Sequence, residues 1–438
     1  IVKDCASIFV KPLHSLFNLI IKTSYFPDIW KEATVTPVFK KGDPSMIENY
    51  RPICVLCNFS KIFESVIYKR LYFSVKSLIS PFQHGFVEKR STVTNLSCFT
   101  QYVSEAIDQN NQVDVIYTDF RKAFDQIDHY VLLRKLNHFG FSDSLLLLLE
   151  SYLLNRKLSA KYRNFVSEAF CPTSGVPQGS NLGPLLFLLF VNDVVNSLTC
   201  QKLLYADDLK VFLSISTLRD CEILQHNLDQ LTSWTIKNRL FLNKDKCFII
   251  TYSRKLTNIV YEYSIEEFNL VRLDTYKDLG VVFDSKFFFK NHIVECTTRA
   301  YNMFGFIYRN CSEFSNVQSL LTLYYSFIRS RLEYAAVIWF PIYSTYIQLL
   351  ESVQRKFLKF VVFLVDGIYP PRGYNHGVLL SRFNCNLLST RRVISSVKLL
   401  HSLISNITDC TYLFNKIVFL VPRLNARSCR TFYYIIPQ

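Results

Sequence analysis

Two features are scarce in this sequence: glycine and long apolar runs. Only 11 of the 438 residues are glycine, about 2.5% against roughly 7% in an average protein. This scarcity excludes a collagen-like chain and flexible Gly/Ser linkers. The longest apolar runs, Pro184 to Val191 and Leu145 to Leu149, fall far short of the roughly 20 residues that a membrane-spanning helix needs. We therefore predict no membrane segment, and the sequence contains no internal repeat.

The number and spacing of the cysteines do not indicate a disulfide framework. The 13 cysteines are odd in number and irregularly spaced, which indicates reduced thiols and an intracellular protein of the nucleus and cytoplasm, not a secreted one. The one CxxC, Cys54 to Cys57, lacks the second pair of a four-ligand zinc site and is interpreted as two small hydrophobic side chains. The chain begins at Ile1 without Met or a leader, so we expect a fragment whose true start lies upstream.

Hydrophobic residues and basic charge are abundant. Half of the residues are hydrophobic and 15% are aromatic, a composition that can bury a core and that excludes a disordered chain. Lys plus Arg number 50 against 35 Asp plus Glu, and the net charge of +15 attracts polyanions without identifying one. At about 150 residues per domain, the length suggests two to four structural units.

The spacing of apolar residues predicts interspersed strands and helices. We expect strands at 35–39, 112–120, 158–170 (a pair), 203–213 (a hairpin), 240–252 and 279–283. We expect helices at 60–75, 131–139, 144–154, 218–231 and over most of 292–363, with a turn-rich loop running into an apolar helix at 174–196. Because the two kinds of element do not alternate regularly, the predicted fold class is α+β.

Three carboxylates carry the chemistry. Asp207 and Asp208 lie between two apolar β runs, and Asp119 ends another. Adjacent buried carboxylates repel each other, and a divalent cation offsets that repulsion. Oxygen ligands favour Mg²⁺ or Mn²⁺, and two such ions can support phosphoryl transfer. A solvated hairpin tip is the alternative explanation for the Asp-Asp pair.

A glycine-containing loop lies between these strands. Three of the 11 glycines fall within the nine residues from Gly175 to Gly183. Positive φ angles or a close backbone approach to another molecule would explain that concentration, and an ordinary helix-entry loop is the alternative.

In their order along the chain, these motifs resemble those of one family. The sequence resembles the reverse transcriptase region of a non-LTR (LINE-type) retrotransposon, of the jockey-like or RTE-like kind. The resemblance rests on residues 30–31, 40–43, 49–53, 83–86 (Gln-His-Gly-Phe), 119–125, 175–180, 205–208 (Tyr-Ala-Asp-Asp), 242–246 and 279–281.

The resemblance implies an RNA-directed DNA polymerase with a right-hand fold. Asp119, Asp207 and Asp208 would be the catalytic carboxylates that bind two Mg²⁺ ions, or Mn²⁺, and Phe120 is counted among the metal-binding positions. One ion would lower the pKa of the primer 3′-hydroxyl, and the other would hold the triphosphate. The implied partners are an RNA template, a DNA primer or target and dNTPs, with no membrane.

Basic residues would contact the phosphates. The resemblance implies that Lys40, Lys41 and Arg51 bind the incoming triphosphate, Arg51 through two parallel hydrogen bonds. Surface charge is the alternative for the two lysines. Lys246 occupies the place of a family lysine that protonates pyrophosphate, with Lys244 as a near competitor.

Other positions would shape the nucleotide pocket. Phe124 matches a bulky residue that excludes a ribose 2′-hydroxyl, with core packing as the alternative. Gln178 and Gly179 would line the nucleotide and template pocket. Asp125 and Asp128 are expected to be structural or solvated, not catalytic.

The implied architecture has four parts. They are an N-terminal segment with fingers (1–112), a palm with an antiparallel sheet (113–285, with a fingers-type insertion around 131–170), a helical thumb (286–370) and an extension of unknown role (371–438). In the palm, Leu279 to Val281 would grip the primer. Four thumb residues are expected to contact the nucleic-acid backbone: Arg329, Arg331, Lys356 and Lys359.

Two alternatives stay open. One is a catalytically silent or domesticated polymerase fold that only binds RNA. The other is a group II intron maturase or another RNA-dependent polymerase, which the Ala-Phe-Asp run at 123–125 and the Lys-Lys-Gly-Asp segment at 40–43 disfavour.

Overall fold

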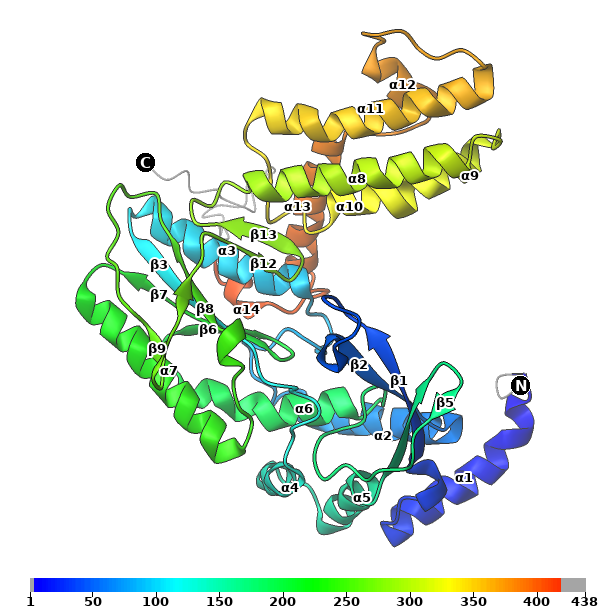
Figure 1. Cartoon of the computed structure of the whole chain (residues 1–438), viewed down its shortest axis with the longest axis vertical. Coiled ribbons are helices and arrows are strands. Elements are labelled where there is room, and N and C mark those ends of the chain that lie inside the picture. Colours follow the sequence, from blue (N-terminus) through cyan, green and yellow to red (C-terminus); the bar gives the residue numbers. More distant parts are fainter. Residues whose placement is uncertain (1–3, 419–438) are drawn as a thin grey trace, which may run out of the picture.

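A five-stranded sheet lies at the centre of the structure, a computed structural model that describes residues 4–418 (Figure 1). Its strand order is β11-β8-β3-β7-β6, and every neighbouring pair is antiparallel except β11 and β8. The strands are β3 (Gln112–Thr118), β6 (Gln201–Tyr205), β7 (Asp208–Ile215), β8 (Phe248–Tyr252) and β11 (Val271–Arg272). This central sheet carries the three carboxylates at one end of its strands.

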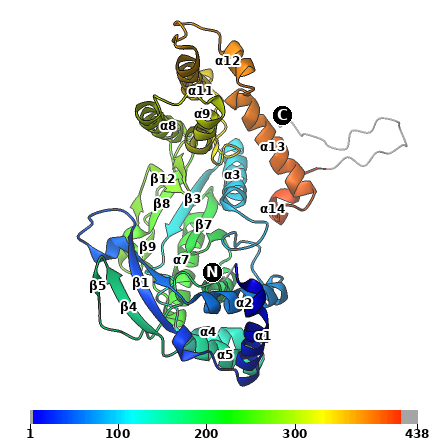
Figure 2. The ribbon, with the colours of Figure 1, turned by 90° about the vertical axis from the view of Figure 1, so that its right-hand side faces the viewer.

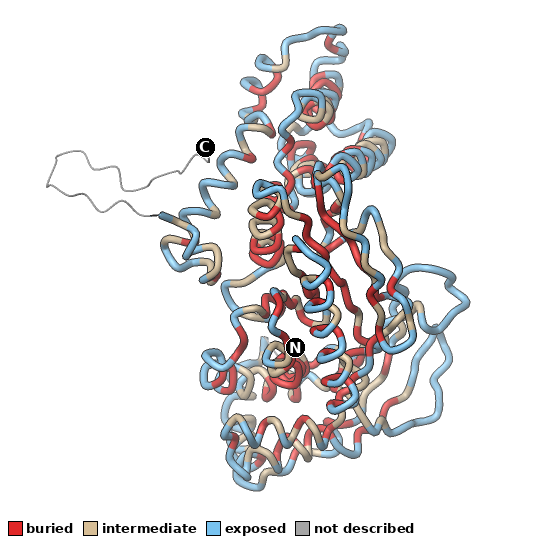
Figure 3. The backbone as a smooth tube through the Cα atoms, turned by 90° about the vertical axis from the view of Figure 1, so that its left-hand side faces the viewer, coloured by how far each residue is buried: buried red, intermediate tan, exposed pale blue. Residues whose placement is uncertain are grey.

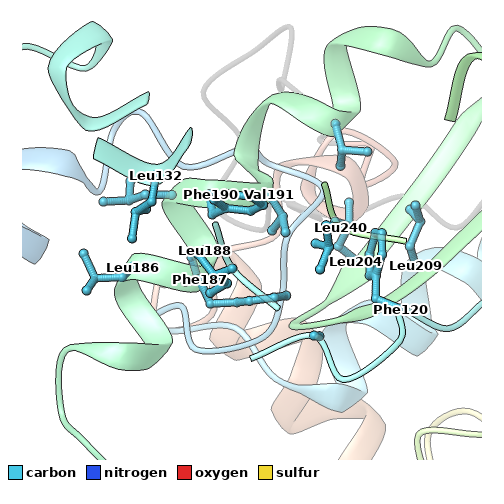
Figure 4. Close-up of a cluster of buried hydrophobic side chains, with 14 of the residues drawn as sticks. Phe120, Leu132, Leu186, Phe187, Leu188, Phe190, Val191, Leu204, Leu209 and Leu240 are labelled. Carbon is cyan, nitrogen blue, oxygen red and sulfur yellow. The ribbon is translucent and has the colours of Figure 1, made fainter. Parts of the chain in front are cut away.

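Both faces of the central sheet are covered. Along β3, Ile116 packs into one hydrophobic cluster while Val115 and Tyr117 pack into the other, as the two-residue period of a strand requires. The first cluster includes the helices α6 (Gly183–Val191) and α7 (Leu218–Asn238), and the close-up in Figure 4 shows its middle. The second includes α3 (Thr92–Asp108) and the hairpin of β12 (Thr275–Asp278) and β13 (Val281–Asp284). In Figure 3 the buried residues run through the middle of the molecule, and exposed residues lie mostly along its outside.

A second sheet lies beside the first and has the order β2-β1-β4-β5. Its strands are β1 (Glu32–Phe39), β2 (Tyr50–Val55), β4 (Lys157–Tyr162) and β5 (Phe165–Val166). The helices near it are α1 (Ala6–Thr23), α2 (Asn58–Val75) and α5 (Asp143–Leu153), and α4 (His129–His138) packs on α5 and α6. A small hairpin of β9 (Ser264–Ile265) and β10 (Phe268–Asn269) packs on α7.

The C-terminal part is helical. It contains α8 (Lys290–Asn310), α9 (Val317–Leu323), a π-helical segment (Tyr324–Arg329), α10 (Ser330–Glu333), α11 (Ser344–Asp366), α12 (His376–Arg382), α13 (Leu388–Ile404) and α14 (Thr411–Phe414). Figure 2 shows α13 running from this helical part back toward the sheet, where α14 lies beside α3. An ion pair between Arg90 and Asp409 (2.7 Å) ties the returning segment down. No helix among residues 4–418 is long and apolar enough to cross a membrane.

The mixed α+β class is confirmed, and most expected elements are present. Two expectations were wrong. Residues 240–252 are not one strand, because a bridge at Leu242 and a 3-10 turn at Lys244–Lys246 precede the short β8. The strand expected at 279–283 begins only at Val281, because Leu279 and Gly280 form the turn of a hairpin with φ values of 44° and 90°.

Candidate active site

Strand register brings the three carboxylates together at one end of the central sheet. Thr118, the last residue of β3, pairs with Leu209 of β7, so the next residue, Asp119, lies beside Asp208. Asp208 in turn pairs with Tyr205 across a two-residue turn that holds Ala206 and Asp207. Asp119 and Asp208 both line a cavity of about 400 Å³, and Asp119 and Asp207 both line another of about 460 Å³. Asp119 is thus common to both cavities, while Asp208 and Asp207 each line one of them.

The surroundings of Asp207 and Asp208 destabilise the charged form of both carboxyl groups. Burial raises the pKa of Asp207, and repulsion from Asp119 adds to it, while Lys40 and Arg51 act in the opposite direction. The Asp208 side chain opens on its cavity, yet the protein groups around the carboxylate raise its pKa to about 7. Loss of solvation is the first cause of that shift, followed by repulsion from Asp207, Asp278 and Asp119.

The donor set fits a divalent cation by its chemistry. Three carboxylates gathered around open cavities carry unfavourable negative charge, and a hard cation relieves this. Within residues 4–418, however, no group of three or more Asp, Glu, His or Cys side chains is arranged so that it could hold a metal ion. Phe120, expected among the metal-binding positions, has a buried ring (Figure 4), and the hydrogen bonds of its bridge to Leu242 use the carbonyl of Asp119 and the N–H of Arg121 instead. Its own carbonyl is therefore left out of that bridge.

Lys246 is the lysine that reaches the carboxylates. Its Nζ lies 3.3 Å from Oδ2 of Asp119, and it lines both cavities. Lys244, the competitor, forms an ion pair with Glu266 instead. Lys40 also lines both cavities, Lys41 lines the one with Asp208, and Arg51 lines the one with Asp207.

Phe124 stands on the wall of the cavity that contains Asp207. Its ring stacks on the buried ring of Phe187, with 4.5 Å between centroids, and meets the half-exposed ring of Phe86 edge-on at 6.2 Å. Phe124 is thus both a packing residue and a cavity residue, and the two interpretations of the sequence are compatible.

The loop before α6 is held in place by several specific contacts. The Gln178 side-chain amide donates a hydrogen bond to Oδ1 of Asp125 (2.8 Å). The backbone carbonyl of Gln178 accepts a hydrogen bond from the backbone N–H of Cys54 (2.7 Å). Gly179 has a φ of +113°, and a Cβ there would lie 2.8 Å from the Cys54 carbonyl oxygen. The glycine is therefore required by conformation and by space.

Glu64 of α2 anchors the other end of this loop, and sequence reasoning missed it. Its fully buried carboxylate accepts hydrogen bonds from Ser60 (2.9 Å) and from the backbone N–H groups of Asn181 (2.8 Å) and Leu182 (3.3 Å). A carboxylate at this point also faces the N-terminus of α6, where negative charge is favourable. A charged residue on the buried side of an amphipathic helix was the available signal.

A buried ion pair next to Asp208 was also missed. Lys210, two residues further along β7, pairs with Asp278 of β12, and their side chains are only 5% and 8% exposed. The signal was a lysine inside the apolar run 209–213.

Asp128 is the N-cap of α4 and accepts a hydrogen bond from Val131 N–H (2.9 Å), which confirms its expected structural role.

The turn at 279–281 contacts the helical part. The Tyr334 hydroxyl donates a hydrogen bond to the Leu279 carbonyl (2.8 Å), and a Cβ on Gly280 would lie 2.9 Å from the Tyr334 ring. The Asp278 end of this hairpin and Leu279 line the cavity with Asp208. This places the expected primer-gripping turn at the rim of the site.

One expected contact of the helical part was wrong. Lys359 is buried, and its ammonium group donates to the Pro371 carbonyl (2.6 Å), so it is not free for a phosphate. Arg331 is exposed, Arg329 pairs with Glu333 at 3.7 Å, and Lys356 lies over the ring of Tyr301. For these three residues, contact with the nucleic-acid backbone stays a prediction.

Comparison with known proteins identifies a family. The family described as "Reverse transcriptase (RNA-dependent DNA polymerase)" matches residues 38–291, more than half of the chain. The chain is 28% identical over 367 residues to the probable RNA-directed DNA polymerase from transposon X-element of Drosophila melanogaster, covering 79% of this chain and 39% of that protein. It is 30% identical over 290 residues to the RNA-directed DNA polymerase from mobile element jockey of the same species, covering 64% and 31%.

The chain therefore spans between about a third and two fifths of the length of these relatives. Among solved structures, apo telomerase from Candida tropicalis aligns with a TM-score of 0.48 and 11% identity, over 92% of this chain and 71% of that one. Telomerase from Candida albicans in complex with a fragment of telomeric RNA aligns with a TM-score of 0.38 and 13% identity, over 90% and 67%.

Proposed function

This chain belongs to the reverse transcriptase (RNA-dependent DNA polymerase) family, of the non-LTR (LINE) type, and we propose that it extends a primer 3′-hydroxyl with dNTPs on an RNA template. The observation that carries the proposal is the meeting of Asp119, Asp207 and Asp208 at one sheet end, between two cavities that share basic residues. A protein that only bound RNA would gain nothing from three carboxylates there, because they repel phosphate.

The carboxylates would hold two Mg²⁺ ions, with Mn²⁺ as a substitute. Such ions supply charge that activates the attacking hydroxyl and stabilises the leaving pyrophosphate. Asp119, Asp207 and Asp208 would provide oxygen ligands, and Phe120 would contribute only through its backbone carbonyl because its ring is buried. A bound cation would relieve the repulsion that Asp207, Asp278 and Asp119 exert on the Asp208 carboxylate.

Basic residues would orient the triphosphate. Lys40 and Arg51 already act electrostatically on Asp207, so a triphosphate held by them would lie next to the carboxylates. Lys41 would add charge on the Asp208 side. Lys246, paired with Asp119, would exchange that partner for the pyrophosphate and donate a proton to it.

The remaining cavity residues would select the nucleotide. The Phe124 ring, fixed against Phe187, would exclude a ribose 2′-hydroxyl. Gln178 and Gly179, fixed on Asp125 and Cys54, would form the floor for the nucleotide and template.

The parts of the chain would then correspond to a right hand. We assign residues 1–112 to an N-terminal segment and fingers, 113–285 to a palm with an insertion around 131–170, and 286–370 to a thumb. Residues 371–438 would be an extension, and in the described part of it α14 packs against α3. The free thiols of the twelve cysteines in the described range support an intracellular setting, in nucleus and cytoplasm.

Primer extension tests the proposal. The purified chain should add dNTPs to a DNA primer on an RNA template in Mg²⁺, and Asp207→Asn should abolish this while the fold and template binding persist. Asp128→Asn is the matched control, because asparagine also caps a helix and the position is outside both cavities. A folded wild-type chain that binds template but adds no nucleotide would contradict the proposal and favour the silent alternative.

A further inference from the structure

The segment Gln83 to Phe86 packs directly against the turn that carries Asp207 and Asp208. Gln83 forms a parallel bridge with Leu204, the residue two positions before Ala206. The Leu204 backbone is held on both sides, by the Phe82 carbonyl (2.9 Å) and by the His84 N–H (2.9 Å). The segment therefore acts as an extra edge beside β6, at the end where the carboxylates lie.

The Gln83 side chain clamps a single residue of that turn. Its Oε1 accepts hydrogen bonds from the N–H of Ala206 (2.9 Å) and of Gly85 (2.8 Å). Its Nε2 donates to the Ala206 carbonyl (3.2 Å). One amide thus satisfies both backbone groups of Ala206, and Gln83 is only 3% exposed.

Ala206 needs such support because of its backbone conformation. Its φ is +56°, a left-handed value that residues with a Cβ seldom adopt. Strain of this kind persists only where the surroundings determine it. Ala206 directly precedes Asp207, so a change in its φ and ψ would re-aim both carboxylates.

Gly85 makes the clamp possible. A Cβ on Gly85 would lie 2.3 Å from the backbone nitrogen of Ala206, so the two backbones approach more closely than any other residue allows. Arg90 fixes the segment from behind, since its Nη1 donates to the carbonyls of Gln83 (2.8 Å) and Ser80 (2.9 Å).

We propose that Gln83 is a positioning residue for polymerisation, which holds the Ala206 turn so that Asp207 and Asp208 face the cavities. The inference rests on the proposed function, since the carboxylates must be catalytic for their aim to matter. Gln83 itself lines neither of the two cavities. Its role is to fix geometry, and its loss should act on the rate of nucleotide addition.

The test compares two buried amides at opposite ends of β6. Asn227, 1% exposed, accepts hydrogen bonds from the N–H groups of Thr199 (2.6 Å) and Cys200 (3.0 Å), just before β6 begins. Gln83→Met and Asn227→Leu each replace the amide by an apolar side chain of similar shape. Both should lower thermal stability, but only Gln83→Met should lower kcat, by roughly 100-fold, because small misplacements of reacting groups cost about that much.

Three further readouts separate positioning from simple destabilisation. For Gln83→Met, the Mg²⁺ concentration for half-maximal rate should rise, while primer–template affinity and the KM for dNTP stay at wild-type values. Gly85→Ala, which pushes the turn away, should reproduce the same pattern. Equal kcat losses in Gln83→Met and Asn227→Leu, or an unchanged kcat in folded Gln83→Met, would overturn the proposal.

Amide hydrogen exchange of the wild-type chain gives a test that does not depend on activity. The N–H of Ala206 should be protected in the wild type and should exchange faster in Gln83→Met. Rapid exchange at Ala206 in the wild type would overturn the clamp. An inactive wild type with a protected Ala206 would instead contradict the proposed function alone.

Discussion

The Lys210–Asp278 ion pair gives the sharpest prediction about the stability of the site. The pair joins β7 to the β12–β13 hairpin directly beside Asp208, and both side chains are almost fully buried. The Lys210 ammonium also lies 4.7 Å from the centre of the Phe99 ring, so its surroundings are apolar. The Asp278 side chain is likewise only 8% exposed, although it lines the cavity with Asp208.

The expected magnitude follows from this burial. Lys210→Met leaves the Asp278 carboxylate buried and unpaired, and removal of one partner of such a pair costs about 3–5 kcal/mol. A domain is typically stable by about 5–15 kcal/mol, so this loss is a large share. The double variant Lys210→Met with Asp278→Leu strands no charge and should recover most of the lost stability.

Urea unfolding of the single and double variants measures these values. The neighbouring Lys277, which pairs with Glu295 at 2.9 Å but is 39% exposed, supplies the control. Lys277→Met should cost less than about 1 kcal/mol, because exposed pairs are weak. If Lys210→Met costs as little as Lys277→Met, or if the double variant is as unstable as the sum of the single ones, the reasoning is wrong.

Two other substitutions test Phe124 in the cavity wall and the support of the loop before α6. Phe124→Val should raise the incorporation of ribonucleotides relative to deoxynucleotides by at least about 10-fold, equivalent to about 1.4 kcal/mol, as measured by competition between the two substrates. An unchanged ratio of ribonucleotide to deoxynucleotide incorporation would show that Phe124 does not exclude the ribose 2′-hydroxyl. Glu64→Gln should lower the unfolding free energy by about 1–3 kcal/mol, because charge-assisted hydrogen bonds to Asn181 and Leu182 are weakened, and should raise the KM for dNTP in steady-state extension. A normal KM would show that the loop does not depend on Glu64.

The sequence was sufficient to predict the elements that carry the three carboxylates. Asp119 follows an apolar run, and Asp207 and Asp208 interrupt another, so strand ends and a hairpin could be expected at these positions. The convergence followed because carboxylates at the ends of neighbouring antiparallel strands lie side by side. The family resemblance then supplied roles that spacing alone does not give.

The partners of other buried polar side chains could not be predicted, because these contacts join distant segments through single polar groups. Glu64 and the loop at Asn181 are separated by 117 residues, and Gln83 and Ala206 by 123. The spacing of apolar residues within one helix or strand does not indicate which side chain bonds the backbone of another segment. For the same reason Lys359 looked like a surface cation, although it bonds the Pro371 carbonyl inside the fold.

Sequence reasoning also missed two local features. The helix α13 (Leu388–Ile404) lies in the tail beyond Pro371, which the sequence left unassigned, and part of its apolar surface stays exposed at Val393 and Val397. The turn at Leu279 and Gly280 was included in a strand because the β-branched residues Val281 and Val282 follow it. There, tertiary context overrode β-propensity.

Single-turnover addition of one dNTP opposite a defined RNA base tests the central claim most directly. At saturating Mg²⁺ and with the primer–template fully bound, the wild-type chain should add the complementary dNTP. Asp208→Asn should be slower by roughly 10³-fold or more, because a charged ligand at the reacting centre is lost. Equal rates for the wild type and a folded Asp208→Asn variant would contradict the claim that the carboxylates at this sheet end carry out the chemistry.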